Sequence, residues 1–571
     1  MGFIIVLAAP VFFLLIGLEF WWGRRLARMG HAAAQTYRLD DTISSISLGM
    51  ISQISAIFTR LLRIGIYTLV FEQVALFPDQ AWWSTWYGVI LALVFYDFCY
   101  YWFHRASHEV AVFWAGHVVH HQSQHYNLST ALRQSTAGAL TSWIFYIPMA
   151  VAGVPPLVFG IVGLIDLLYQ FWVHTEHVGD LGWFDRWFCS PSNHRVHHAV
   201  NDGYVDRNYG GIWMVWDRLF GSFQAEDPAK PCVYGTRTPL NSWDPAWANL
   251  QVWADLFRSS WQARRWSDKL MVWWRPPGWQ SADMALHSPK PAFKLHQHTL
   301  FQPQQSQTVQ TIAWIWFLAL LGATMVVLWH MDNMPWGQAA TCVLAVSAGL
   351  WGVNALLQNR ISPLMCAYVQ LASITIVTEV LGWVELYQMF KPLTMLALMY
   401  IGWSASHLPK PTKDWLVRAL GLSWLGDVLL LYPSMFLAGL VAFLAAHVCY
   451  IVMLGKDAPW LRSRRALALS MAIAVLVFVV LDQNGLSQDL RWPVAAYVLV
   501  IATMAAQAWG RAKHLGDAAS RLVGWGSVLF MLSDSLLALD KFVSPLPLAG
   551  LWVLATYYLA QGLIVRGRLK A

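Results

Sequence analysis

Residues 86–121 have the sequence WYGVILALVFYDFCYYWFHRASHEVAVFWAGHVVHH, in which an apolar run leads directly into closely spaced histidines. The part from 86 to 103 approaches the ~20 apolar residues that a transmembrane helix needs. His104 and His108 continue the same helix beyond the membrane, and more histidines follow at 117–121. The stretch therefore predicts a membrane-spanning helix that presents histidine side chains at the membrane surface.

The composition of the whole chain is also that of a membrane protein. Hydrophobic residues make up 57% of the 571 positions, charged residues 12% and aromatic residues 15%. This balance excludes a soluble protein, and the aromatic residues suit the depth of lipid headgroups. Further apolar runs lie at 3–22, at 47–75, at 139–173 on both sides of a Pro-Pro pair, and at ten places between 311 and 566. We therefore predict an all-α, polytopic membrane protein, in which a histidine-rich helical domain is fused to a bundle of eight or more transmembrane helices.

The basic residues predict the orientation of these spans. The net charge is +7, and most Lys and Arg residues lie in loops that the spans place on one side. By the positive-inside rule this side is the cytoplasm, so the histidine regions at 104–138 and 174–310 face it. The charge excess is thus explained by topology and does not indicate nucleic-acid binding. The compact loops and the absence of a targeting sequence favour a bacterial inner membrane. The six cysteines are scattered and indicate neither disulfides nor a thiolate metal site.

The histidines are concentrated in one part of the chain, because 11 of the 19 lie between 104 and 198. One pair is four residues apart, and two H-x2-H-H motifs supply side chains at i, i+3 and i+4, so each cluster shares one helical face. These eight residues are His104, His108, His117, His120, His121, His194, His197 and His198. His174, His125 and His177 are candidate additional ligands. Asp97 lies on the same helical stripe as the first pair and either ligates or orients a ligand.

So many imidazoles imply two metal ions, because eight or more nitrogens exceed the four to six ligands of one ion. Neutral imidazole suits Zn, Cu, Fe and Ni. A hydrolytic zinc site usually keeps a carboxylate, or three histidines with an open position. An all-nitrogen pair at the membrane surface instead favours oxygen activation on an aliphatic chain. We therefore predict two iron ions, held by the eight histidines and His174.

The pattern H-x3-H, H-x2-H-H and H-x2-H-H resembles the fatty acid hydroxylase (sterol desaturase) superfamily over about residues 40–225. Within it, YNLSTALRQS at 126–135, NYGG at 208–211 and WDRLFG at 216–221 resemble the alkylglycerol monooxygenase family. This resemblance implies a di-iron site with tetrahydrobiopterin and O2 as co-substrates. It further implies that alkylglycerols are hydroxylated at the ether-bearing carbon, and that the resulting hemiacetal releases fatty aldehyde.

The same resemblance implies roles for residues near the second histidine cluster. Asn127, Arg133 and Gln134 are expected to contact the cofactor or the lipid headgroup. Gln124 and His125 are a departure, because the family pattern leads us to expect acidic residues just before Tyr126.

In the run from 363 to 566 the apolar segments carry a few polar groups, and ionisable residues inside a membrane are functional candidates. The strongest pair is Asp427 and Asp534, and the other candidates are Lys391, His447, Tyr450, Asp540 and Gln561. The arrangement resembles the YhhN-type lysoplasmalogenase family, an eight-helix membrane fold, which implies hydrolysis of the vinyl ether of lysoplasmalogens. That reaction needs a proton at the β-carbon and water at the α-carbon, which one carboxylic acid and one carboxylate can supply. We expect the two aspartates to divide these catalytic roles.

Together these patterns predict three regions and two activities. A hydroxylase-like di-iron membrane domain is expected at 1–225, a cytoplasmic or surface-lying linker at 226–310, and a YhhN-type bundle at 311–571 with its core at 363–566. The predicted protein is a bifunctional membrane enzyme that cleaves alkylglycerol ethers and lysoplasmalogens. The alternative is a sterol, fatty acyl or carotenoid hydroxylase whose C-terminal bundle binds or transports lipid without catalysis. Only ether cleavage would yield fatty aldehyde and glycerol.

Overall fold

The computed structural model describes residues 2–30 and 36–570 of the chain. Within these residues the regular structure is helical, apart from two isolated bridges that pair Phe188 with Trp213 and Ala199 with Tyr234. Ten of the described helices are long and apolar enough to cross a membrane. The predicted all-α, polytopic membrane fold is therefore confirmed.

The chain divides into two compact units. The first extends to residue 333 and includes 353–360, and the second consists of 334–352 together with the chain from 361 onward. The helix α16 (Gln307–His330) belongs to the first unit, where it packs on α1 and α2. The three predicted regions do not coincide one for one with these units, and that division stays a prediction.

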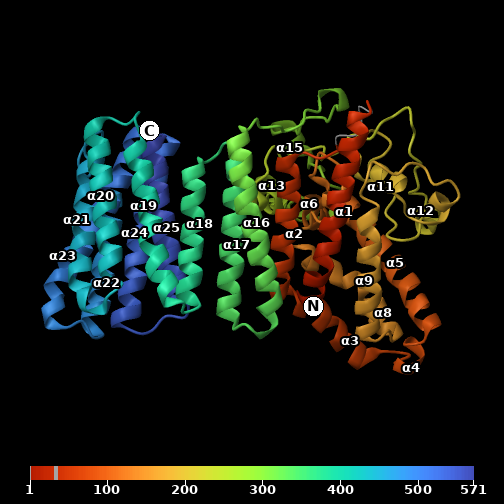
Figure 1. The fold of residues 1–571 in the computed structure, drawn as a ribbon, viewed down its shortest axis with the longest axis horizontal. Helices are drawn as coiled ribbons and strands as arrows, with labels where there is room; N and C mark the ends of the chain where they lie inside the picture. Colours follow the sequence, from red (N-terminus) through yellow and green to blue (C-terminus); the bar gives the residue numbers. More distant parts are fainter. Residues whose placement is uncertain (1, 31–35, 571) are drawn as a thin grey trace. The chain divides into compact units, whose positions relative to one another are not determined.

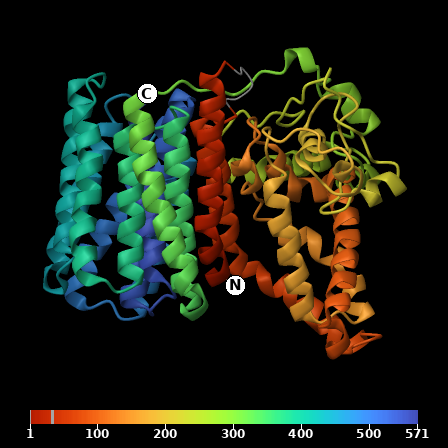
Figure 2. The ribbon, with the colours of Figure 1, turned by 45° about the vertical axis from the view of Figure 1, so that its right-hand side comes forward.

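The first unit contains the histidine-rich region. Its longer helices are α1 (Gly2–Arg28), α2 (Leu39–Arg60), α5 (Trp86–Glu109), α6 (Ala111–His121), α8 (Gly138–Ala152), α9 (Pro156–Trp172), α13 (Pro245–Gln262) and α16. Its shorter elements are η2 (Leu61–Gly65), α3 (Ile66–Val74), α4 (Gln80–Trp83), α7 (Leu128–Ala131), α10 (Phe184–Trp187), α11 (Pro191–His198), α12 (Val215–Leu219), α14 (Trp266–Trp274), α15 (Ala282–His287), η3 (Leu295–Gln297) and η4 (Met331–Asn333). Figure 2 shows the yellow and yellow-green segments, which follow α9, gathered at one end of the orange helices.

The helices α8 and α9 form a hairpin that holds α5 in place. Gly153 ends α8 in the left-handed conformation, with φ of 100°, and Pro156 begins α9 at a position where proline is favoured. Both helices pack against α5, and buried residues of the three elements share one apolar core, which includes Tyr96, Met149 and Val162. The hairpin thus supports the helix that carries the first two histidines.

Residues 226–310, predicted as a linker or surface-lying segment, form helices that pack on the histidine-bearing α6. The helices α13 and α14 both contact α6. Ala111 and Ala115 of α6 share an apolar core with Leu256 of α13 and Val272 of α14. The segment therefore covers one side of the helix that leads to the second histidine cluster.

The second unit is a bundle of long helices, among which α24 and α25 lie side by side (Figure 1). Each apolar run predicted between 336 and 566 coincides with one helix. These helices are α17 (Trp336–Leu357, whose last residues belong to the first unit), α18 (Pro363–Val380), α19 (Val384–Ser404), α20 (Lys410–Leu429), α21 (Phe436–Leu454), α22 (Arg464–Gln483), α23 (Gln488–Leu515), α24 (Ala518–Phe542) and α25 (Ala549–Leu569). A short 3-10 turn, η5 (Pro433–Met435), precedes α21.

Candidate functional site

Three helices of the first unit carry most of the clustered histidines. The helix α5 ends with the first pair, α6 ends with the second cluster, and α11 carries the third. Ser190 caps α11 by accepting a hydrogen bond from the backbone N–H of Asn193, and Pro191 takes the first helical position. Both features favour the start of a helix. His174 lies just after α9.

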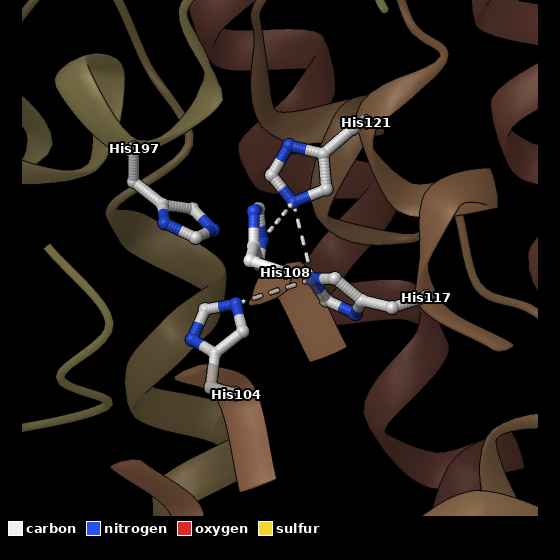
Figure 3. A group of neighbouring side chains, drawn as sticks. All are labelled: His104, His108, His117, His121 and His197. Atoms are coloured by element: carbon white, nitrogen blue, oxygen red, sulfur yellow. Dashed lines mark hydrogen bonds between the residues drawn. The ribbon is translucent and has the colours of Figure 1, made fainter. Parts of the chain in front are cut away.

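The structure brings all nine predicted metal-ligating histidines together in two groups. In each group the candidate ligand atoms lie within 4.8 Å of one another. The first group is His104, His108, His117, His121 and His197, and the second is His120, His174, His194 and His198. Figure 3 shows the five side chains of the first group turned toward one another.

Each H-x2-H-H motif is divided between the two groups. His117 and His121, four residues apart, join the first group, whereas His120 joins the second. The third cluster is also divided: His197 joins the first group, whereas His194 and His198 join the second. Residues i and i+4 point ~40° apart around a helix, whereas i+3 and i+4 point ~100° apart. One helical turn can therefore supply ligands to two neighbouring ions.

The spacing of the imidazole nitrogens fits metal ions. Neighbouring Nε2 atoms within each group lie 3.1–3.2 Å apart. Ligands about 2.1 Å from one ion, the usual metal–imidazole length, lie about 3.0–3.4 Å from each other in octahedral and tetrahedral geometry. The two groups adjoin, because the rings of His121 and His198 stack with centroids 4.3 Å apart. The histidine groups are therefore consistent with a metal centre of two ions.

Backbone carbonyls orient several of these imidazoles. Nδ1 of His104 lies 2.9 Å from the carbonyl oxygen of Tyr209, and Nδ1 of His120 lies 3.0 Å from that of Arg133. His174 makes the same contact within its own turn, at 2.8 Å. A carbonyl can only accept, so each Nδ1 carries the proton and Nε2 keeps its lone pair for a metal. The Nε2 lone pairs of His120 and His174 therefore face each other at 3.2 Å and repel, which a cation between them would relieve.

Burial lowers the pKa of several of these imidazoles and so keeps them neutral, as metal ligands must be. The pKa of His120 is lowered to about 4, chiefly because burial disfavours the charged ring. Burial and repulsion from neighbouring histidines lower the pKa of His197 and His198 well below the ordinary value. The Nε2 atom of His197 is buried and has no hydrogen-bond partner among the described residues, as expected of an atom placed to bind an ion.

Asp97 lies outside both histidine groups and instead holds the loop before α12. Its carboxylate accepts hydrogen bonds from the backbone N–H of Ile212 at 2.6 Å and from the indole N–H of Trp216 at 2.8 Å. A Cβ atom at Gly211 would lie 2.8 Å from Asp97 Oδ1, so only glycine permits this approach. The loop carries Tyr209, whose carbonyl orients His104. Asp97 therefore affects the histidine groups only indirectly, by holding the loop that carries Tyr209.

Two residues important for this loop were not singled out from the sequence. Asp217 accepts hydrogen bonds from the backbone N–H groups of Tyr209 and Gly210, both at 2.8 Å. The tyrosine ring also packs near His108, with centroids 5.5 Å apart. The NYGG and WDRLFG motifs contain both residues, but nothing in their spacing indicates that they meet.

His125 and His177, two of the candidate additional ligands, lie outside both groups. Nδ1 of His125 lies 3.2 Å from a carboxylate oxygen of the buried Asp41. Gln124 accepts a hydrogen bond from the backbone N–H of Phe301 at 2.8 Å. The two residues that depart from the family pattern thus contact α2 and the segment after α15.

The three predicted cofactor-binding residues occupy different environments. Asn127 caps α7 and donates hydrogen bonds to backbone carbonyls. Arg133 is 0% exposed, and its guanidinium donates to Val119 O at 2.8 Å and to nearby side chains of α2. Gln134 is half-buried and donates to Ala131 O. A role of these residues in cofactor binding stays a prediction.

The two acidic candidates of the second unit line a single cavity of about 290 Å³. Asp427, on α20, accepts a hydrogen bond from the Tyr557 hydroxyl at 2.6 Å and lies 3.8 Å from Nζ of Lys391. Asp534, on α24, accepts a hydrogen bond from the Tyr497 hydroxyl at 2.5 Å. The rest of the lining is largely apolar, with side chains from α21 to α25. The cavity thus combines paired acids with walls suited to an aliphatic chain.

The other polar candidates of the bundle differ in their relation to this cavity. Nε2 of the buried His447 lies 3.0 Å from the Tyr497 hydroxyl and 3.4 Å from Asp534. Asp540 is part of the cavity lining. Tyr450 donates a hydrogen bond to Gln561, and neither belongs to that lining. Tyr497 was not singled out from the sequence, because a tyrosine in an apolar helix carries no distinguishing signal.

Two family models match the chain, one in each half. Residues 89–222 match the Fatty acid hydroxylase model. Residues 386–568 match the model of the YhhN family. The first match contains both histidine groups, and the second contains the aspartate cavity except for Glu379. No solved structure is similar to the chain.

Curated proteins of two kinds are similar to different parts of the chain. Alkylglycerol monooxygenase of Homo sapiens is 42% identical over 245 residues, which are 42% of this chain and 53% of the human protein. The Caenorhabditis elegans protein of the same name is 36% identical over 220 residues, 38% of this chain and 43% of that protein. The chain thus spans about half the length of these relatives. Lysoplasmalogenase TMEM86B of Rattus norvegicus is 34% identical over 191 residues, 33% of this chain and 75% of the rat protein.

Proposed function

The chain belongs to the YhhN family through its C-terminal part and carries a fatty acid hydroxylase domain before it, and from this premise we propose that it is a bifunctional ether-lipid enzyme. The N-terminal domain oxidatively cleaves alkylglycerol ethers, and the C-terminal bundle hydrolyses the vinyl ether of lysoplasmalogens. The observation that carries the proposal is the arrangement of nine histidines in two adjoining groups, in a chain that also has a cavity lined by two aspartates.

In the N-terminal domain, the histidine groups would hold two iron ions. Bound iron would supply the activation of O2, with tetrahydrobiopterin as the electron donor. The imidazoles would hold the ions through Nε2, and backbone carbonyls keep the rings of His104, His120 and His174 in one orientation. Burial of the groups excludes bulk water from the reacting carbon. Asn127, Arg133 and Gln134 are proposed to hold the pterin or the glycerol headgroup.

The first reaction consumes an alkylglycerol, O2 and the reduced pterin. One oxygen atom enters the C–H bond of the ether-bearing carbon, and the other leaves as water with two electrons from the pterin. The product is a hemiacetal, which breaks its C–O bond to release fatty aldehyde and glycerol. The C–H bond that reacts belongs to a lipid chain in the membrane. The substrate chain therefore has to reach the histidine groups from the membrane.

The second reaction needs only water. A proton is added to the β-carbon of the vinyl ether and water to the α-carbon, after which the hemiacetal releases fatty aldehyde and the glycerophospho-base. Asp427 and Asp534 line one cavity, so one acid can deliver the proton while the other carboxylate accepts a proton from water. Tyr557 and Tyr497 donate hydrogen bonds that hold the two carboxyl groups in place.

Both reactions release a long-chain aldehyde from an ether-linked glycerolipid, which gives the fusion a chemical reason. The basic loops support a histidine centre that faces the cytoplasm. The assignment to a bacterial inner membrane stays a prediction.

A crossed assay tests both activities in the full-length protein. Wild type is given either a 1-O-alkylglycerol with tetrahydrobiopterin and O2, or a lysoplasmalogen without pterin, and fatty aldehyde is measured. We expect His120→Ala to abolish only the first activity and Asp427→Asn only the second. Each variant thus serves as the folding control for the other.

Two outcomes would support the rival functions. Hydroxylated sterol, fatty acid or carotenoid, with no aldehyde from alkylglycerol, would assign the histidine centre to another hydroxylation. Lysoplasmalogen that binds to wild type but is not hydrolysed would indicate a bundle that carries lipid without catalysis.

A further inference from the structure

Two buried arginines meet one carboxylate at an end of the C-terminal bundle. Arg511, on α23, is 1% exposed, and Arg568, on α25, is 3% exposed. Asp457, in the loop after α21, accepts hydrogen bonds from Arg511 Nε at 2.7 Å and Nη2 at 2.8 Å, and from Arg568 Nη1 at 2.7 Å. Two guanidinium groups therefore share one carboxylate.

This cluster leaves positive charge and hydrogen-bond donors uncompensated. Two guanidinium groups face a single carboxylate, and a buried charge without a partner is costly. Among the described residues, Nη1 of Arg511 and Nε of Arg568 are buried and have no hydrogen-bond partner. Buried polar atoms are nearly always paired, so unpaired donors on two neighbouring cations point to a missing anionic acceptor.

A pocket of about 640 Å³ lies beside the cluster. Arg511 and Asp457 line it together with Lys570 and with residues 517–519 at the start of α24. The N-terminus of a long helix attracts anions through its backbone N–H groups. Asp517 caps this helix through the N–H of Ser520. Two cations, Arg511 and Lys570, and two carboxylates, Asp457 and Asp517, line the pocket. Arg568 lies behind Asp457 as a third cation, so the cluster as a whole carries a net positive charge.

The pocket is separate from the aspartate cavity. The cavity is lined by the first halves of α21, α23 and α25, through residues such as Phe443, Tyr497 and Tyr557. The arginine cluster lies at the opposite ends of the same three helices, in the loop after α21 and at positions 511 and 568. A ligand held by the arginines therefore does not occupy the proposed catalytic site.

We propose that this end of the bundle is a binding site for a phosphate group, with Arg511 as its guanidinium donor, Lys570 at its rim, and Arg568 compensating the charge of Asp457. Arginine forks match the oxygen geometry of phosphate and supply charge-assisted hydrogen bonds. Because the arginines lie at the helix ends that the positive-inside rule places at the cytoplasm, the phosphate comes from an inner-leaflet lipid headgroup or from a soluble phosphate ester.

The test uses the full chain purified in a non-ionic, phosphate-free detergent. Its melting temperature is recorded during titration with inorganic phosphate, with glycerol 3-phosphate and, separately, with short-chain phosphatidylglycerol. The variants are Arg511→Gln and Lys570→Gln, and the matched control is Arg465→Gln, an exposed arginine at the start of α22. We expect phosphate compounds to raise the melting temperature of wild type and control, and Arg511→Gln to weaken the apparent affinity about 10-fold or more.

The three compounds distinguish the possible sources of the phosphate, and their effects decide whether the proposal holds. Stabilisation by all three compounds supports a site for soluble phosphate esters, whereas stabilisation by phosphatidylglycerol alone supports a lipid headgroup. Should Arg511→Gln fail to fold, Lys570→Gln takes its place, because Lys570 lines the pocket and makes no bond to Asp457. No stabilisation by any compound, or equal affinity in wild type and the pocket variants, overturns the proposal.

Discussion

Nε2 of His120 lies 3.2 Å from Nε2 of His174, although 54 positions separate the two residues in the chain. His120 belongs to the last turn of α6, and His174 follows α9. The second histidine group therefore forms only when the α8–α9 hairpin has packed beside α5 and α6. Metal binding should accordingly depend on the folding of the whole first unit.

The histidine groups predict a sharp difference between two neighbouring residues. His174→Ala removes a member of the second group, and we expect it to lower the bound metal of the purified protein by about half or more. His177→Ala is the matched control, because His177 lies outside both groups, and it should leave the metal content unchanged. Elemental analysis of both proteins measures the effect. Equal metal content in the two variants would contradict the assignment.

The close approach of Gly211 to Asp97 predicts that one added methyl group at residue 211 strongly weakens metal binding. In Gly211→Ala the new Cβ would lie 2.7 Å from Asp166 Oδ1 and 2.8 Å from Asp97 Oδ1, so the loop must move. Because the loop orients His104 through the Tyr209 carbonyl, we expect metal affinity to fall about 10- to 100-fold. Competition with a chelator measures it. Gly179→Ala, with nothing within 4 Å of its Cβ, should match wild type.

The lowered pKa of His120 predicts how the metal-free protein responds to acid. The unfolded chain takes up a proton near the ordinary value of 6.5, whereas the folded chain does so only near 4. Protonation between these values favours the unfolded state, so the free energy of unfolding decreases as pH falls from 6.5 to 4, by about 3 kcal/mol for this group alone.

Melting temperatures of metal-free wild type and His120→Gln at pH 7.5, 6.5 and 5.5 check this dependence. The variant should lose less stability over the range than wild type does. Identical pH dependence in the two proteins would show that His120 takes no part in it.

The C-terminal cavity predicts that adjacent tyrosines differ in importance. Tyr557 donates a hydrogen bond to Asp427 at 2.6 Å, so Tyr557→Phe removes a contact that holds a proposed catalytic carboxyl group. We expect lysoplasmalogen turnover to fall about 10-fold. Tyr558→Phe is the control, because that tyrosine does not make this bond. If both variants retain the wild-type kcat, the hydrogen bond from Tyr557 is not needed for the catalytic role of Asp427.

Local patterns were sufficient to identify which residues belong to the candidate metal centre. Eight of the nine histidines could be selected because H-x3-H and H-x2-H-H follow the helical repeat, and His174 was added as a candidate further ligand. The helices themselves could be selected because apolar runs of membrane length are unambiguous. The pair of aspartates in the bundle could be selected because hydrocarbon excludes isolated charges. In each case the signal lies within a few consecutive residues.

Contacts between distant segments could not be selected in this way. Asp97 was expected to ligate a metal or to orient a ligand, and it acts on a histidine only indirectly, by holding the loop whose Tyr209 carbonyl contacts His104. The role of Arg133 at the cofactor stays a prediction, but the contacts of its fully buried guanidinium with α2 and α6 could not be selected from the sequence. Nothing in a single sequence states which loop will lie beside a buried carboxylate or guanidinium.

The sequence by itself determined the helical membrane fold, the two families and the membership of the histidine set, because hydropathy and the 3.6-residue repeat are local properties. Only the tertiary structure decided how that set divides, with His120 in one group and His117 and His121 in the other. It also decided that Asp427 and Asp534, on different helices, line one cavity. The physical reason is that ligand groups and cavities are formed by side chains from several helices, whose distances are set by packing and not by their order in the chain.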